Sequence, residues 1–251
     1  VWQEVLDTKE LNKRFYKELS NWYFWARANA RFPALPHETT PEAKDERLST
    51  ALIRLITRLI FVWFLKEKAL VPETLFDKTR INAYLKDEHK VSGDGDSYYK
   101  AILQNLFFAT LNTEMNHDAT DSRGFKQASN KGQRYNSEYM THTRYRYESY
   151  FEDPSEALTL FEDIPFLNGG LFECLDKAAA ESASGKEERV DGFSDVGTRQ
   201  ACVPDALFFG EDNVDLNKVY GTKNKRPEHV TGILNIFNRY KFTIAENTPV
   251  E

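Results

Sequence analysis

The segment from residue 46 to residue 70, ERLSTALIRLITRLIFVWFLKEKAL, constrains the fold more than any other stretch of this chain. Its apolar side chains recur every three or four residues, which is the period of a helix with a wide apolar face. From Leu59 to Leu65 the predicted helix is apolar on all sides. A helix of this kind must be covered by other elements. We therefore expect residues 46–70 to form a central, buried helix.

A membrane span is the alternative use of such a segment. A helix that crosses a bilayer needs about 20 consecutive, mainly apolar residues. Arg54, Thr57 and Arg58 interrupt the apolar run well before that length. The sequence therefore favours a core helix, and we expect no membrane partner.

The rest of the chain predicts a mainly α fold, a helical bundle built around residues 46–70 as one domain over residues 1–251. Helical spacing of apolar side chains is present in residues 7–30, 98–112 and 230–240, and shorter helices fit residues 74–87 and 154–161. We expect the helix at 98–112 to pack against the central helix. Two pieces at 201–203 and 207–209 are typical of strands, so minor β structure is expected in the C-terminal third.

Four consecutive aromatic residues, Trp22 to Trp25, lie within the first predicted helix. Aromatic side chains at helical spacing normally serve burial, so core packing is the favoured interpretation. Stacking on nucleic-acid bases is the alternative.

The chain has 251 residues and opens without Met directly into a helix, as expected for a fragment of a larger protein. It has only two cysteines, Cys174 and Cys202, which are too few for a disulfide framework or a four-thiolate zinc site. These features predict a protein of the reducing cytoplasm without a metal site.

Residues 116–150 form a predicted loop that differs in character from the helices, because it is poor in aliphatic side chains. Between residues 123 and 146 it has one acidic residue and three tyrosines, and a fourth tyrosine, Tyr147, follows directly. The same stretch has six basic residues: Arg123, Lys126, Lys131, Arg134, Arg144 and Arg146. Basic side chains displace counterions from phosphates and tyrosines stack on bases, so this is the candidate nucleic-acid-binding segment. Composition alone slightly favours the alternative, a solvated loop that its tyrosines anchor to the fold.

Residues 176–229 form an acidic, partly β segment. Ten acidic and four basic residues between positions 176 and 216 account for the whole net charge of −6. This balance argues against non-specific coating of nucleic acid by the whole domain. It also allows a different function, in which the acidic segment binds a basic protein.

Catalytic motifs are missing from the sequence. It has no Gly-x-Ser-x-Gly, no phosphate-binding P-loop and no Gly-x-Gly-x-x-Gly after a predicted strand. The glycine-rich loop and the Asn-Pro-Pro-Tyr type tetrapeptide that an adenine methyltransferase needs are also missing. We therefore assign no catalytic, cofactor-binding or metal-binding residue.

Five blocks of sequence carry a family resemblance through their order along the chain. They are residues 55–70, 103–112, 164–173 (IPFLNGGLFE), 203–210 (VPDALFFG) and 233–251. Together they resemble the N-terminal helical or connector region upstream of the methyltransferase in large single-chain type IIG restriction-modification enzymes, and in their relatives in phage-exclusion systems. The resemblance covers nearly the whole chain.

The resemblance implies that the parent protein is an adenine-N6 DNA methyltransferase that uses S-adenosylmethionine. A Mg-dependent nuclease module, when present, would precede this region. The chain itself would be a non-catalytic scaffold that contacts double-stranded DNA and the nuclease and methyltransferase modules of its parent. The alternative function is a protein–protein interaction module that does not bind DNA.

Overall fold

The computed structural model describes residues 2–114, 123–125, 142–167, 169–210, 214–221, 223 and 229–240, with the backbone alone for residues 2–9. The longer helices are α1 (Trp2–Asn29), α2 (Pro41–Glu67), η3 (Tyr98–Leu111) and α7 (Ile233–Arg239). Short helical turns connect them: η1 (Glu73–Phe76), α3 (Lys78–Asn82), η2 (Asp87–His89), η4 (Glu148–Tyr150), α4 (Pro154–Leu158), η5 (Gly170–Phe172), η6 (Gly197–Arg199), α5 (Ala206–Phe209) and α6 (Leu216–Tyr220). The fold is mainly α, as predicted.

Strands β1 (Val214–Asp215) and β2 (His229–Val230) form a two-stranded antiparallel sheet, in which Val214 pairs with Val230 and Asp215 pairs with His229. The prediction of minor β structure in the C-terminal third is therefore confirmed. The predicted strand at 207–209 is wrong, because these residues form helix α5. The residues near 201–203 contribute a single bridge, between Arg31 and Cys202. Short apolar runs cannot be assigned to helix or strand by periodicity alone.

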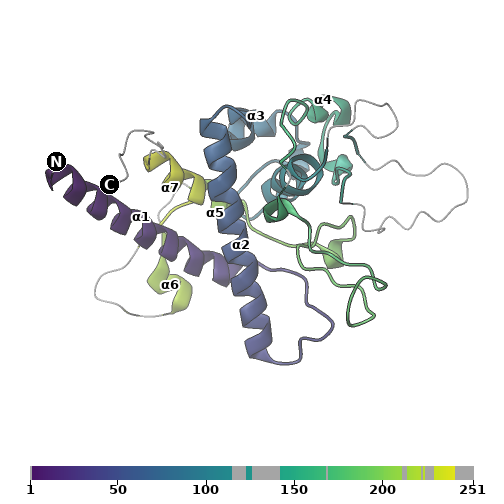
Figure 1. Cartoon of the computed structure of the whole chain (residues 1–251), viewed down its shortest axis with the longest axis horizontal. Coiled ribbons are helices and arrows are strands. Elements are labelled where there is room, and N and C mark those ends of the chain that lie inside the picture. Colours follow the sequence, from purple (N-terminus) through teal and green to yellow (C-terminus); the bar gives the residue numbers. More distant parts are fainter. Residues whose placement is uncertain are drawn as a thin grey trace, which may run out of the picture.

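Helix α2 begins at Pro41, five residues before the predicted start at residue 46. The Thr40 hydroxyl accepts a hydrogen bond from the Ala43 N–H at 3.2 Å, and Pro41 occupies the first turn. Proline fits this position because the N–H that it lacks would have no partner there. Helices α1 and α2 cross in Figure 1, and an ion pair between Arg27 and Asp45 joins the end of α1 to the start of α2.

One face of α2 is buried and the other is not. Leu52, Leu55, Leu59 and Val62 lie in the core, whereas the side chain of Ile53 is 58% exposed. Phe61, within the stretch predicted to be covered on all sides, is 39% exposed. The expectation that every side of the helix is covered is therefore wrong. The neighbouring elements pack against only one side of this helix.

The most enclosed of the long helices is η3, since every residue from Tyr98 to Leu111 is buried. It is a π-helix, with the wider turn that i→i+5 hydrogen bonding gives. The Arg58 guanidinium of α2 lies over two of its rings, 5.8 Å from the centroid of Phe107 and 4.9 Å from that of Phe108. The predicted packing of this helix against α2 is thus confirmed, although η3 and not α2 lies at the centre of the core.

Helix α2 is long and apolar enough to span a membrane by length and composition. In the most apolar window of the helix, however, 44% of the residues are buried inside the protein. The helix also carries Arg58, whose guanidinium forms a buried ion pair with Asp191. Both observations fit a helix that packs against a protein core.

Candidate functional site

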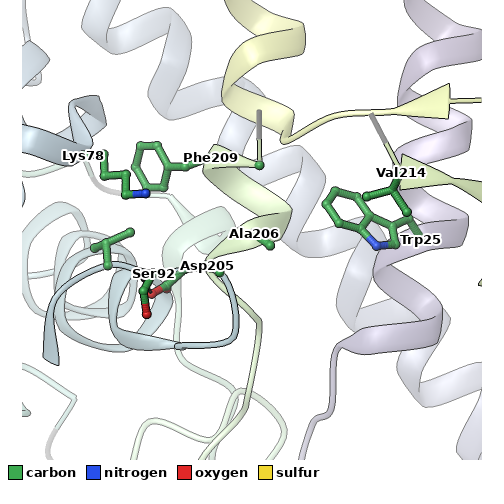
Figure 2. Close-up of a pocket in the computed structure, with 10 residues that line it drawn as sticks. Trp25, Lys78, Ser92, Asp205, Ala206, Phe209 and Val214 are labelled. Atoms are coloured by element: carbon green, nitrogen blue, oxygen red, sulfur yellow. Dashed lines mark hydrogen bonds between the residues drawn. The ribbon is translucent and has the colours of Figure 1, made fainter. Parts of the chain in front are cut away.

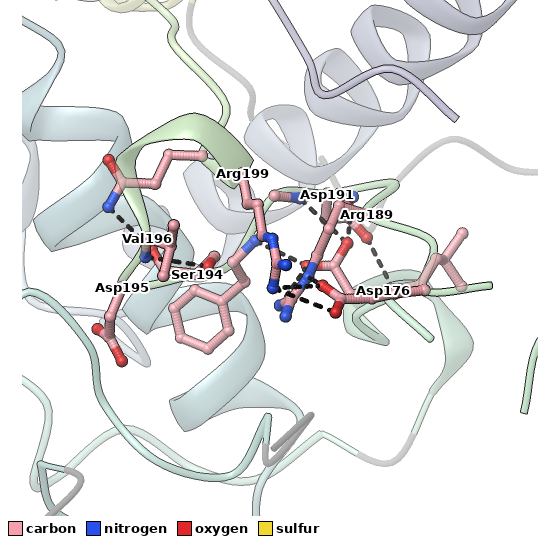
Figure 3. Close-up of polar contacts among 12 residues, drawn as sticks. Asp176, Arg189, Asp191, Ser194, Asp195, Val196 and Arg199 are labelled. Carbon is pink, nitrogen blue, oxygen red and sulfur yellow. Dashed lines mark hydrogen bonds and ion pairs between the residues drawn. The ribbon is translucent and has the colours of Figure 1, made fainter. Parts of the chain in front are cut away.

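A buried network of charged side chains joins α2 to the segment that precedes η6. Figure 3 shows the contacts within that segment, among them those of Asp176, Arg189 and Asp191. The centre of the network is the ion pair between Arg58 and Asp191, in which Nη1 and Oδ1 lie 2.8 Å apart. The remaining donors of the Arg58 guanidinium also have partners. Nε donates to the Leu171 carbonyl and Nη2 donates to the Glu173 carbonyl, both at 2.8 Å. Arg58 therefore connects α2 to the backbone at residues 171–173 and to the side chain of Asp191.

The second carboxylate of the network, Asp176, is bound by backbone donors. Its oxygens accept hydrogen bonds from the N–H groups of Asp191, Gly192 and Phe193, at 2.7, 3.1 and 2.8 Å. Burial raises the pKa of Asp176, and the nearby Asp191 charge adds to this shift. Gly192 has a φ of +64°, and a Cβ there would lie 2.5 Å from the Ala201 nitrogen. Only glycine fits this turn without displacing the backbone.

Cys174, Asp176 and Asp191 bring three potential metal ligands together, with ligand atoms within 4.8 Å of one another. Their other contacts do not suit a cation. The carboxylate of Asp191 is paired with Arg58, and Arg54 Nη1 lies 3.6 Å from the same oxygen. Burial raises the pKa of Cys174, which disfavours the thiolate that a metal requires. The cluster is therefore better described as an internal ion-pair network than as a metal site.

Arg123, one of the six predicted nucleic-acid-binding residues, is used inside the protein. Its Nη1 donates to the carbonyls of Ile164 and Phe161, at 2.6 and 3.3 Å. Its Nη2 donates to the carbonyls of Thr110 and Thr113, at 2.8 and 3.1 Å. These last two carbonyls lie at the C-terminal end of η3, where a cation is favourable. Burial lowers the pKa of Arg123.

Arg146 is also directed inward. Its side chain is buried, and its Nη1 lies 2.7 Å from Asp195 Oδ2. Its guanidinium carbon lies 5.0 Å from the centroid of the Phe193 ring, and its backbone N–H donates to the Asn105 side chain. Its side chain therefore joins residues 145–147 to the segment at 193–195, and its backbone joins them to η3.

The tyrosines on either side of Arg146 attach the same segment. Both rings are buried. The Thr110 hydroxyl donates to the Tyr145 oxygen at 3.0 Å, and the Tyr147 hydroxyl donates to Gln104 Oε1 at 2.6 Å. These two tyrosines fit the alternative stated above, an anchored loop, and they are not placed to stack on bases.

The other basic residues of the segment give less information. Arg144 is half-buried. Lys126, Lys131 and Arg134 lie outside the described residues. Of the three basic residues of this segment that the structure describes, Arg123 and Arg146 are directed into the protein.

A pocket of about 360 Å³ lies between α1, α5 and the segment before η3 (Figure 2). Trp25 and Val214 line one end, and Lys78, Ser92 and Asp205 line the other. Burial raises the pKa of Asp205 to about 6. Its carboxylate accepts hydrogen bonds from the backbone N–H groups of Ser92 and Tyr98, at 3.0 and 2.9 Å. The described lining residues include neither a second carboxylate nor a histidine. Asp205 therefore holds the start of η3, and we assign it no catalytic role.

Sequence reasoning did not foresee the Arg58–Asp191 network, although a signal was present. Arg54 and Arg58 lie one turn apart within the mainly apolar stretch at residues 51–65. A buried arginine requires a partner, so this pair predicts a carboxylate opposite α2. The identity of that partner could not be read from the sequence, since Asp191 is 133 residues away.

Comparison with known proteins gives one distant relationship. The chain is 24% identical over 208 residues to a Methanocaldococcus jannaschii protein named "Putative type II restriction enzyme and methyltransferase RM.MjaORFECS2P". The alignment covers 83% of this chain and 11% of that protein. No family model matches the chain, and no solved structure matches it. The chain thus has a distant relative with a restriction-modification name, in agreement with the resemblance of its five sequence blocks.

Proposed function

We propose that this chain is a non-catalytic helical scaffold of a restriction-modification protein, a connector that spaces other modules and contacts DNA. The observation that carries the proposal is the comparison with the M. jannaschii protein, in which most of this chain aligns with about one ninth of a much longer protein. A segment of that size fits one module among several. The Arg58–Asp191 network supports the mechanical role, because it fixes α2 to turns more than 100 residues away.

The catalytic chemistry belongs to the parent protein in this proposal. The parent is a cytoplasmic adenine-N6 DNA methyltransferase of the type IIG kind that uses S-adenosylmethionine, with or without a Mg-dependent nuclease. Its biological role is defence against phage. The partners of the scaffold are double-stranded DNA and the neighbouring nuclease and methyltransferase modules.

The DNA contact of the scaffold is assigned to the basic segment between residues 123 and 146. We assign phosphate contact to Lys126, Lys131, Arg134 and Arg144. Arg123 and Arg146 instead position the two ends of the segment, since their guanidinium groups bind carbonyls and a carboxylate of the protein.

A binding experiment with duplex DNA tests this assignment. Fluorescence anisotropy at several salt concentrations gives the dependence of affinity on salt. Each phosphate contact contributes a slope of about −0.9 in log affinity against log salt. Replacing the four assigned residues with alanine should therefore reduce the slope by up to about 3.6. Replacing the exposed Lys177 and Lys186 with alanine is the control, and it should leave the slope nearly unchanged.

The assignment is refuted if the alanine variant retains the slope of the unchanged protein. If this protein does not bind duplex DNA even at low salt, the proposal that it contacts duplex DNA is refuted.

The second candidate is a protein-interaction module that does not bind DNA. The observation that favours it is the outer face of α2, where Ile53 and Phe61 are exposed on an apolar helix. The acidic segment offers a basic partner less surface charge than its composition predicts, because Asp176, Asp191 and Asp205 are buried. Lack of DNA binding at both low and high salt, together with a folded protein, would favour this candidate.

A further inference from the structure

The outer face of α1 presents aromatic rings and positive charges next to one another. Tyr16 is 67% exposed and Phe24 is 41% exposed, while Lys13 and Lys17 are exposed on the same side of the helix. Residues three, four, seven and eight positions apart share one face of a helix, so these four side chains form one surface.

Helix α6 extends this surface. Its last residue, Tyr220, is 46% exposed, and its ring meets the ring of Phe24 edge-on with centroids 6.3 Å apart. The Tyr220 hydroxyl donates to the Phe24 carbonyl. We call the five residues Lys13, Tyr16, Lys17, Phe24 and Tyr220 the α1–α6 surface.

The aromatic rings of the α1–α6 surface are not required by the core. The core-facing side of α1 carries Trp22 and Trp25, which are both buried, and Trp22 Nε1 donates to the Leu207 carbonyl at 2.6 Å. The four-residue aromatic cluster is therefore divided. Its two tryptophans serve packing, as predicted, and Phe24 points outward.

The charge of this surface is mainly positive. Glu10 lies 3.4 Å from Lys13, but both side chains are largely exposed, and such a pair contributes little. Glu18 instead contacts Arg239 and Tyr240 of the α7 region. Arg27 is paired with Asp45 and is not part of this surface.

We propose that the α1–α6 surface binds single-stranded DNA. Exposed aromatic rings stack on bases, and neighbouring lysines attract the phosphates between them. Lys13 and Lys17 are separated along the helix by about 6 Å, so they meet successive parts of one strand. Duplex DNA offers phosphates to the lysines but no bases to the aromatic rings, because its bases are already stacked inside the double helix. A protein partner fits less well, since lysine is depleted at the centres of protein interfaces.

This site is distinct from the basic segment assigned to duplex DNA. In Figure 1, α1 and α6 lie on one side of α2 and α4 lies on the other. The basic segment precedes α4 in the chain, and Phe151, which lies between them, forms a bridge with Leu85. The proposal therefore does not depend on the function of residues 123–146.

The test measures binding of a fluorescent oligothymidine of about ten nucleotides, within the range of known single-strand site sizes. The double variant Phe24→Ala/Tyr220→Ala removes two stacking rings, and its affinity should fall by roughly 30-fold or more. Phe61→Ala removes an exposed ring from α2 and is the matched control, with an expected change below about 2-fold. A second variant, Lys13→Ala/Lys17→Ala, should reduce the salt slope by about 1.4. Its control is again Lys177→Ala/Lys186→Ala.

Two results would overturn the proposal. One is oligothymidine affinity that stays unchanged in both the ring variant and the lysine variant. The other is equal loss in the Phe61→Ala control, which would show a general effect of surface substitution. If the ring variant unfolds, the lysine variant decides alone. Duplex affinity is measured in parallel. If variants of the α1–α6 surface lose single-strand binding and keep duplex binding, the proposal is supported. Loss of duplex binding alone, in variants of the basic segment, bears only on the function of residues 123–146.

Discussion

The Arg58–Asp191 ion pair gives the sharpest test of how this protein is held together. Replacing Arg58 with Met keeps an unbranched side chain in the core but removes the partner of a buried carboxylate. The carbonyls of Leu171 and Glu173 lose their donors in the same variant. Breaking a buried ion pair from one side costs about 3–5 kcal/mol. For a chain of this size, each kcal/mol lowers Tm by about 2–4 °C, so we expect Tm to fall by roughly 6–20 °C.

The assay is thermal unfolding for Tm and urea unfolding for the free energy of unfolding, both followed by circular dichroism, with Arg58→Met, Asp191→Asn and the double variant compared in one cycle. Asn keeps the shape of Asp191 and removes its charge. The double variant should be more stable than the sum of the two single losses predicts, with a coupling free energy of about 1–3 kcal/mol. A loss below about 1 kcal/mol for Arg58→Met would refute the network as a main support of the fold. Additive losses without coupling would refute the pairing of these two residues.

Three further predictions concern Gly192, Arg123 and Asp205. Gly192→Ala should destabilise the protein by about 1–3 kcal/mol or more in urea unfolding, because a Cβ meets the Ala201 nitrogen. Gly185→Ala is its control, with a similar positive φ and open space around it, and should cost less; equal losses would contradict the steric argument. Arg123→Ala should reduce stability by about 1–3 kcal/mol in the same assay without changing the salt slope of duplex binding, and an altered slope would contradict its structural role. The Asp205 carboxyl has a folded pKa of about 6, raised above its usual value, so its contribution to stability is complete below about pH 4 and is lost as pH rises toward 6 and above. Between pH 4 and pH 7 the free energy of unfolding of the unchanged protein should fall relative to that of Asp205→Asn by up to about 3 kcal/mol, and parallel pH profiles would contradict this pKa.

Much of the helical structure was predictable from local sequence. Apolar periodicity identified α1, α2, η3 and α7. It placed the start of α2 at residue 46, because the first turn from Pro41 is polar and is set by the Thr40 cap instead of by apolar spacing. The prediction of one continuous helix at 74–87 was wrong, because η1 and α3 are separate helices there. The Asp77 side chain accepts from the N–H groups of Thr79 and Arg80, which starts a new helix at that point.

Periodicity did not predict which of the long helices would be most completely buried. The segments that form α2 and η3 are both apolar over long stretches. The surrounding turns cover η3 completely and leave Ile53 and Phe61 of α2 exposed. Periodicity shows which face of a helix is apolar, but it does not show how many neighbours will cover that helix.

The sequence by itself determined the mainly α class, the positions of the long helices and the presence of a basic, tyrosine-rich segment. Only the tertiary structure decided what the charged and aromatic side chains do. Arg123 and Arg146 contact carbonyls and a carboxylate of the protein, whereas Phe24 and Tyr220 come together on the surface from positions 196 residues apart. The physical reason is that composition gives the chemistry of a side chain, while the groups that it meets depend on contacts between distant parts of the chain.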